Sequence, residues 1–115
     1  MQVMSDTYSD TLEKLLHQVH PRIFSTHQVT FKNCFGAIAG YVDGRIFVSC
    51  GKFGVALRLT PKTLTELLKE EGVSSLRYFP KGHVKKEYAV LPRRILDDRG
   101  HFRQLLDESI EFALS

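Results

Sequence analysis

A single Asp-Gly pair between two apolar runs constrains the fold of this chain more than any other feature. Residues 37–42 (Ala-Ile-Ala-Gly-Tyr-Val) precede Asp43 and Gly44, and residues 45–50 (Arg-Ile-Phe-Val-Ser-Cys) follow them. Asp-Gly between such runs is the strongest short-range signal for a β-hairpin, because both residues of a two-residue loop need a positive φ. The pair therefore predicts a hairpin, and with it an antiparallel sheet.

The same loop predicts which side chains share a face of the sheet. If Asp43 and Gly44 are the two loop residues, Val42 lies opposite Arg45 and the side chains alternate from there. One face then combines small residues on the first strand with bulky residues on the second, which leaves room for a helix to lie close. We expect this core face to contain Tyr41, Ala39, Ala37, Ile46, Val48 and Cys50.

Apolar periodicity along the chain predicts a two-layer α+β fold, in which helices pack on an antiparallel sheet. The predicted order of elements is α-β-β-β-α-β-β-α. The strands fall at residues 37–42, 45–50 and 53–59, and then at residues 76–79 and 87–91, while residues 29–31 are extended ahead of them and residues 33–36 form a bulge or bend.

Capping residues predict where the helices begin and end. Asp10, followed three residues later by Glu13, resembles a capping box at the start of the first helix, which ends before Pro21. For the other two helices, we predict the ends from residue types that favour the N-cap, the first turn or the C-cap. These signals are Thr60 and Pro61 with Gly72 for the second helix, and Asp97 or Asp98 for the third.

Length and composition favour a single domain, residues 1–115. With 115 residues and 43% hydrophobic content, the chain can bury one core and is too short for two ordinary domains. No apolar run approaches the roughly 20 residues of a membrane span, and the N-terminus lacks signal-peptide features, so we expect a cytoplasmic protein without a membrane partner. Cys34 and Cys50 are too few for a disulfide framework, which favours reduced thiols over the alternative of a redox pair.

The order of elements and the residues of the hairpin resemble the N-terminal domain of the TfoX/Sxy family. Members show a Met-Phe-Gly-Gly start, an aromatic Asp-Gly-Lys/Arg-x-Phe hairpin and a Leu-Tyr-Leu-Arg-like strand. In this chain Phe-Gly precedes Asp-Gly-Arg-Ile-Phe, and Val-Ala-Leu-Arg-Leu at residues 55–59 stands in the place of the later strand. The residues of this structural motif are Phe35, Gly36, Asp43, Gly44 and Phe47.

This resemblance implies a secretion-chaperone-like α+β domain of a competence regulator, a protein that controls DNA uptake alongside a cyclic-AMP-responsive activator. Cys34 and Ala37 replace the family's Met and second Gly, and the family's separate C-terminal helical domain has no counterpart before Ser115. The resemblance therefore predicts a stand-alone N-terminal domain that binds a protein, such as a transcriptional regulator, and it leaves oligomerisation open.

No residue pattern indicates an enzyme, a metal site or a bound cofactor. His17 and His20 are three residues apart, but no motif supplies a third metal ligand, so we favour surface histidines. Gly36, Gly40 and Gly44 do not have the spacing of a dinucleotide-binding loop and are better explained by bends and close packing. We therefore expect a non-catalytic interaction domain without a cofactor.

A basic stretch at residues 77–103 supports an alternative function, nucleic-acid binding. Its candidate contacts are Arg77, Lys85, Lys86, Arg93 and Arg94, together with Lys81, Arg99 and Arg103. Aromatic residues near these cations could stack on bases, namely Tyr41, Tyr78, Phe79 and Tyr88. A solvated face is the commoner explanation, because no helix-turn-helix, zinc finger or RNA-binding motif accompanies the charge. We therefore favour protein binding, through a sheet edge or an apolar patch.

Overall fold

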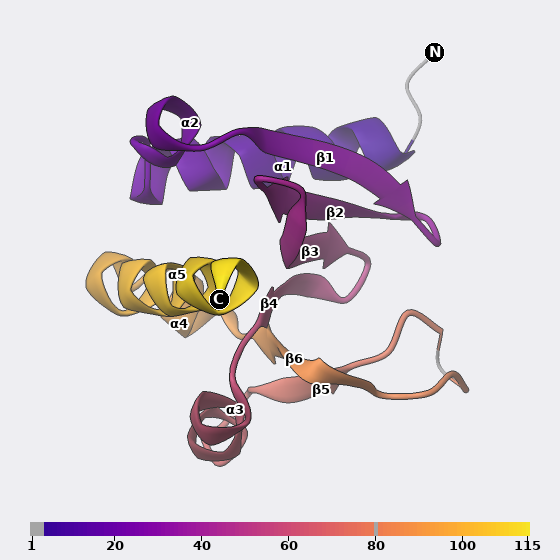
Figure 1. Ribbon diagram of the computed structural model, residues 1–115. Coiled ribbons are helices and arrows are strands. Elements are labelled where there is room, and N and C mark those ends of the chain that lie inside the picture. Colours follow the sequence, from indigo (N-terminus) through magenta and orange to yellow (C-terminus); the bar gives the residue numbers. More distant parts are fainter. Residues whose placement is uncertain (1–3, 80) are drawn as a thin grey trace.

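Figure 1 shows the computed structural model, which describes residues 4–79 and 81–115. Within these residues, six strands form one antiparallel sheet in the order β1-β2-β3-β4-β6-β5. The strands are β1 (Val29–Cys34), β2 (Ala37–Val42), β3 (Arg45–Gly51), β4 (Gly54–Arg58), β5 (Ser74–Leu76) and β6 (Lys85–Leu91). The helices are α1 (Met4–Val19), α2 (Ile23–Thr26), α3 (Pro61–Leu67), α4 (Arg93–Leu96) and α5 (Arg99–Leu114).

The predicted α+β class and antiparallel sheet are confirmed, but one strand more than predicted precedes α3. β1 pairs with β2 along its whole length, from Val29 opposite Val42 to Cys34 opposite Ala37. The expected bend over residues 33–36 is instead a two-residue hairpin loop, formed by Phe35 at φ 50 and Gly36 at φ 80. The short helices α2 and α4 are also absent from the predicted order.

The Asp43-Gly44 hairpin is present, but the helices cover the face opposite to most of the predicted core face, and a β-bulge shifts the register of the hairpin. Val42 pairs with Arg45 as predicted, yet Gly40 pairs with Val48, so β3 holds one extra residue at this point. A bulge reverses the alternation of side chains beyond it. The helix-covered face carries Ile38, Val42, Phe47, Val48 and Cys50, while Ala37, Ala39, Tyr41 and Ile46 lie on the other face.

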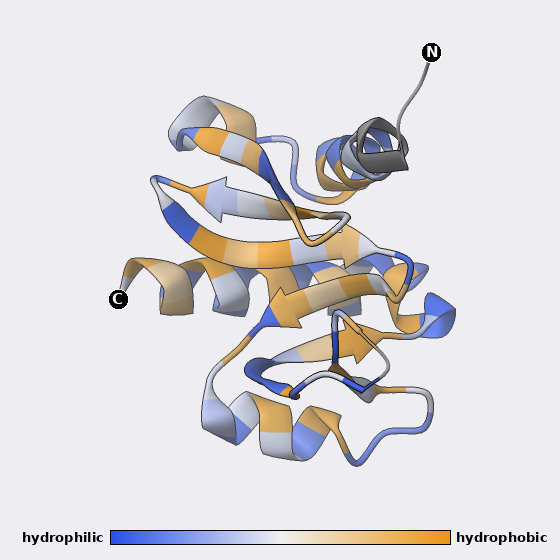
Figure 2. Ribbon diagram, turned by 90° about the vertical axis from the view of Figure 1, so that its right-hand side faces the viewer, coloured by the Kyte–Doolittle hydropathy of each residue, from blue (hydrophilic) through white to orange (hydrophobic). Residues whose placement is uncertain are grey.

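The main core lies between one face of the sheet and two long helices. α1 packs on β2 and β3, and α5 packs on β3 and β4. The largest fully buried side chains of this layer include Leu12, Leu16, Phe47, Leu57, Phe102 and Leu106. Figure 2 looks onto the opposite face of the sheet, with α5 behind the strands. We call this the open face, because the two long helices cover only the other one. A smaller buried cluster of Ala56, Leu76 and Tyr88 lies on the open face.

The structure confirms two of the three predicted helix starts. The Thr60 hydroxyl accepts a hydrogen bond from Thr63 N at 3.3 Å, and the Asp98 carboxylate accepts one from His101 N at 3.1 Å. The predicted capping box is wrong, because α1 already begins at Met4 and so places Asp10 inside the helix.

Two predicted element ends also differ from the structure. α3 ends at Leu67, ahead of Gly72, which lies at φ 87 in the loop that follows. β5 covers Ser74–Leu76 where the sequence predicts residues 76–79. As a result, Tyr78 and Phe79 lie in a loop rather than in a strand.

Candidate interaction surface

Aromatic side chains from three separate loops meet at one end of the open face. Phe35 lies in the β1–β2 loop, Phe53 in the β3–β4 loop, and Tyr78 and Phe79 follow β5. These three loops project to the same side of the molecule in Figure 1. Phe35 is 68% exposed and Phe79 is 54% exposed. We call these four side chains the aromatic surface, because exposed apolar groups that gather in one place mark interaction sites.

Ring contacts hold the aromatic surface together. The centroid of the Phe35 ring lies 5.6 Å from that of Tyr78 and 5.6 Å from that of Phe79, and Phe53 lies 5.6 Å from Tyr78. The rings meet at interplanar angles of 58°, 66° and 87°, which are the tilted and edge-on arrangements that aromatic pairs favour. Beside the rings lies a hollow of about 310 Å³.

Phe35 has a backbone conformation that phenylalanine rarely adopts. Its φ of 50 lies in the left-handed region, which costs a non-glycine residue about 1–2 kcal/mol. Asp43 occupies the equivalent loop position of the next hairpin at φ 48, but a short polar side chain tolerates this conformation. A strained residue that also exposes a large ring is typical of a functional position rather than of a purely structural one.

A hydrogen bond with the buried Ser49 holds the hydroxyl of Tyr78 in place. The Ser49 hydroxyl donates a hydrogen bond to Ile38 O at 3.1 Å and lies 3.2 Å from the Tyr78 hydroxyl. Burial raises the pKa of Tyr78 to about 12, so its phenol stays neutral at physiological pH. Tyr78 is thereby fixed as a platform between the exposed Phe35 ring and the sheet.

Lysine side chains border the aromatic surface. The Lys85 ammonium lies 5.9 Å from the centroid of the Tyr78 ring, and Lys52 lines the hollow. On the same face, the Lys32 ammonium lies 5.1 Å above the Tyr41 ring. Both ring distances are within the range of cation–π attraction. The open face therefore combines exposed rings with positive charge.

The structure divides the basic stretch between opposite sides of the sheet. Arg77 and Lys85 belong to the β5–β6 hairpin, as does Lys86, whereas Arg93 and Arg94 lie on α4 beside α5 (Figure 1). Internal contacts engage several of these cations, so they do not form one continuous surface for a nucleic acid. These contacts are Arg77 with Gly82 O at 2.7 Å, Arg93 with Asp97 at 3.7 Å, and Arg94 with Glu71 O at 2.6 Å.

The candidate base-stacking residues are also not equivalent. Tyr88 is only 8% exposed, since its ring belongs to the small cluster of the open face, and this burial raises its pKa. Tyr41 is half-buried beneath Lys32. Tyr78 and Phe79 are brought together with Phe35 and Phe53, two residues that the sequence analysis did not connect with them. The signal that could have found this grouping is a set of aromatics placed at three loops of a single sheet.

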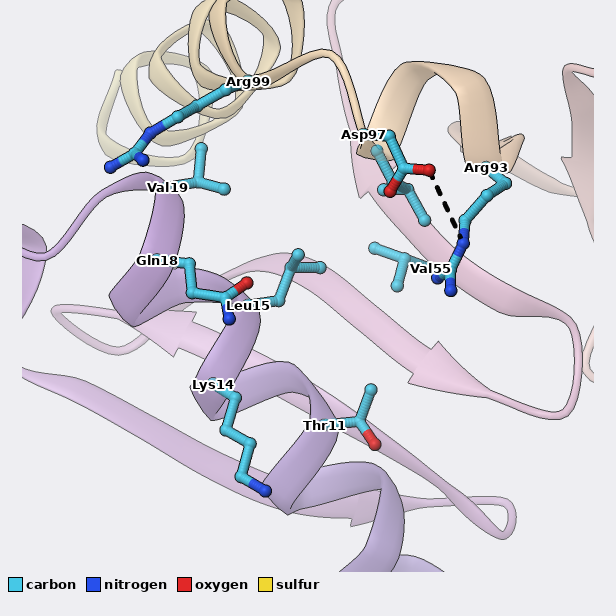
Figure 3. A pocket seen from close by; sticks show the side chains of 10 residues that line it. Thr11, Lys14, Leu15, Gln18, Val19, Val55, Arg93, Asp97 and Arg99 are labelled. Atoms are coloured by element: carbon cyan, nitrogen blue, oxygen red, sulfur yellow. Dashed lines mark ion pairs between the residues drawn. The ribbon is translucent and has the colours of Figure 1, made fainter.

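A larger groove lies on the helix side, between α1 and the corner of α4 and α5 (Figure 3). It has a volume of about 720 Å³, and α1 lines it with residues 11, 14, 15, 18 and 19, which fall on one helical stripe. Val55 and Val19 contribute buried apolar surface, and Arg93 and Asp97 form an ion pair at its edge. The described residues that line the groove include no pair of side chains arranged as nucleophile and base.

The two candidate histidines and the two cysteines do not form a common site. His17 stacks on the Phe24 ring at 3.9 Å, and His20 contacts Asp107 at 3.1 Å. Cys50 is buried in the main core, with a pKa raised by burial to about 11, while Cys34 lies on the open face near Tyr78. The two thiols therefore lie on opposite faces of the sheet. Among residues 4–79 and 81–115, no group of three or more His, Cys, Asp or Glu could hold a metal ion.

These features define an α+β domain whose sheet is covered by helices on one face and presents exposed aromatics and lysines on the other. The chain belongs to the TfoX N-terminal domain family, whose model matches residues 23–113. This family is not a known enzyme family. Searches of curated proteins and of solved structures found no match. In the part of the chain that the structure describes, no helix is long and apolar enough to cross a membrane.

Proposed function

We propose that this chain is a non-catalytic regulatory domain that binds a protein partner through the aromatic surface. The observation that carries the proposal is Phe35, a 68% exposed ring held at φ 50 in contact with Tyr78 and Phe79. Aromatic side chains dominate the binding energy of protein interfaces. Exposing one at the cost of backbone strain is consistent with a role in binding.

Membership of the TfoX N-terminal domain family supports the regulatory setting. The resemblance described above extends the proposal to the control of DNA-uptake genes, with a transcriptional regulator as the partner. The location of such a regulator favours a cytoplasmic domain.

The test compares a double variant, Phe35→Asn with Phe79→Ala, with the single variant Leu68→Ala. Asparagine suits the positive φ of the Phe35 position and removes the ring, so the hairpin loop is retained. Leu68 is 40% exposed at the C-cap of α3, away from the aromatic surface, and serves as an apolar control. Each variant replaces the native copy in the cell that encodes the chain, and circular dichroism first verifies the fold.

Crosslinking followed by mass spectrometry then measures capture of a transcriptional regulator, and transcript levels of DNA-uptake genes report its activity. We expect the double variant to lose both, and Leu68→Ala to retain both. If the double variant folds and retains the captured regulator, the aromatic surface is not the docking site and the proposal is wrong.

A further inference from the structure

The charges of this chain are distributed unevenly between its sheet and its helices. Residues 29–59 and 73–91, which make up the strands and their loops, hold eight Lys or Arg and two carboxylates, a formal net charge of +6. The remaining residues hold eight Lys or Arg and eleven carboxylates, a net charge of −3. The overall charge of +3 conceals this division.

Both carboxylates of the sheet segments are engaged internally. Glu87 accepts a hydrogen bond from Arg58 Nε at 3.0 Å. Asp43 accepts one from Gln28 N at 2.8 Å, in the loop between β2 and β3. Among the described residues of the sheet segments, both carboxylates are therefore already bound. Neither is left to pair with the lysines that border the aromatic surface. A partner that meets this face needs negative charge.

The hollow beside the aromatic surface has walls suited to a large apolar side chain. Three rings border it, from Tyr8, Phe53 and Tyr78, and Phe35 closes one side. Gly36 and the buried Ala37 add small apolar surface, and Lys52 brings positive charge to the lining. Its volume of about 310 Å³ is at the low end of ligand pockets, which corresponds to a single anchoring group rather than to an extended ligand.

We propose that the segment of the partner that contacts this surface is acidic and inserts one aromatic or large aliphatic side chain into the hollow. This inference rests on the proposed function, since it specifies the chemistry of the protein that docks there. The anchor buries apolar area against Phe53 and Tyr78, and the flanking carboxylates of the partner pair with Lys52 and Lys85.

The tilt of the rings distinguishes this partner from a single-stranded nucleic acid. Base stacking needs an open ring face, and successive bases need several faces along one path. Here each neighbouring pair of rings meets at 58° or more, so the edge of one ring covers the face of another. This arrangement encloses a hollow and does not form a flat platform. A side chain fits it better than a run of bases.

The test measures binding by fluorescence anisotropy with defined probes. The main probe is a short synthetic peptide in which one Phe is flanked by Glu and Asp on both sides. Three other probes separate its features: the same peptide with Ala for Phe, the same peptide with Lys for its acids, and an oligothymidine of similar length. The full chain is used throughout, with Lys52→Glu as the test variant and Lys62→Glu as a control on α3, where Lys62 is also exposed.

We expect the acidic Phe peptide to bind, with affinity about tenfold weaker when Ala replaces Phe, because the anchor carries most of the binding energy. Lys52→Glu should weaken binding by about threefold to tenfold, and Lys62→Glu should leave it unchanged. Equal affinity for the Lys peptide, no binding of the acidic peptide, or preferential binding of oligothymidine overturns the inference. If the acidic peptide fails while the variant at Phe35 and Phe79 still loses its regulator, the inference fails and the proposed function stands.

Discussion

Two hairpin loops of this chain use the same backbone geometry with different residues. Asp43 and Gly44 lie at φ 48 and φ 83, and Phe35 and Gly36 lie at φ 50 and φ 80. Both pairs have the positive φ values that a two-residue loop of type I′ requires. The glycine supplies the second position at no steric cost in each loop, and only Asp43 is a residue that commonly occupies the first. The conformation of Phe35 therefore lowers local stability, and it leaves a large ring exposed.

At residue scale, two glycine substitutions should have opposite effects on stability. Gly44→Val should lower the free energy of unfolding by about 1–3 kcal/mol, because a β-branched residue is strained at φ 83. Gly100→Ala should raise it by about 0.5–1 kcal/mol, since Gly100 lies in the first turn of α5 and an added Cβ would lie 3.9 Å from Asp98 Oδ1, an ordinary van der Waals distance. Urea unfolding measures both. A shift of the same sign in the two variants would contradict this assignment of the loop and the helix.

His20 should make stability depend on pH. Burial, and then the nearby Arg103 guanidinium, lower the pKa of His20 below its ordinary value of 6.5, and Nδ1 is buried without a hydrogen-bond partner among the described residues. The unfolded chain therefore binds a proton more readily than the folded chain. The contribution of neutral His20 to stability is complete above pH 6.5 and is lost as the pH falls below that value toward the lowered pKa.

Urea midpoints measured between pH 7.5 and pH 5 in about half-unit steps test this expectation. The wild type should lose more stability across this range than His20→Gln, which cannot titrate. Parallel curves for the two proteins would show that another group controls the pH dependence.

At the scale of elements, one serine connects α5 to the bulged part of the sheet. The Ser109 hydroxyl is fully buried and lies 2.8 Å from Phe47 O and 2.6 Å from Arg58 O. It therefore links the helix to β3 at the bulge and to the end of β4. This contact occurs where the strands are least regular, so the serine replaces hydrogen bonds that a regular ladder would supply.

Ser109→Ala should lower the free energy of unfolding by about 1–3 kcal/mol, because it removes the one hydroxyl proton that the carbonyl oxygens of Phe47 and Arg58 share. Ser25→Ala is a suitable control, since the exposed Ser25 hydroxyl donates a hydrogen bond to Arg22 O within its own turn. Thermal unfolding of the two variants gives the comparison. A cost for Ser109→Ala no larger than that for Ser25→Ala would show that the buried contact contributes nothing.

The elements that the sequence predicts correctly are those that local signals determine. Asp43-Gly44, Thr60-Pro61 and Asp98 each act through their own backbone neighbours, and all three lie where the sequence predicts them. The bulge at Phe47 has no such local signal, and it lies where β3 packs against α1 and α5 and buries the Phe47 ring in the main core. The bulge moves Val48 and Cys50 to the face opposite Ile46, whereas Ala37, Ala39 and Tyr41 lie on the open face because the helices cover the side of β2 that carries Ile38 and Val42. Alternation predicts which residues share a face, but not which face the helices cover.

The candidate site was only partly predictable for a similar reason. The sequence singled out Phe35 as a motif residue and Tyr78 with Phe79 as aromatics near cations, but it gave no reason to place them together. Their contact depends on β1 pairing with β2 and on β5 ending at Leu76, which leaves the following aromatics in a loop. The sequence pattern of residues 76–79 predicts a strand and therefore gives no indication of that loop. The surface is therefore a product of topology and not of a contiguous motif.

At the scale of the whole molecule, the division of charge determines how the domain should respond to DNA. The sheet segments are cationic, and the remaining residues carry most of the carboxylates, including Asp97 and Glu70 near the ends of helices, which pair with Arg93 and Arg94. A duplex that approached the open face would meet lysines, while the arginines of α4 would face the other way. The basic residues of the sequence therefore cannot grip one duplex together.

We expect the domain alone to form no sequence-selective complex with duplex DNA. Any retardation in a gel shift should be weak, should be the same for unrelated duplexes, and should disappear near about 0.2 M salt, because it reflects only counterion release from phosphates. The double variant Arg93→Glu with Arg94→Glu should retard DNA as the wild type does, since both arginines are engaged with carboxylates on the helix side. A sequence-selective, submicromolar complex that this double variant abolishes would instead identify α4 as a DNA-binding element. In that case the alternative function, nucleic-acid binding through residues 77–103, would replace the protein-binding domain proposed above.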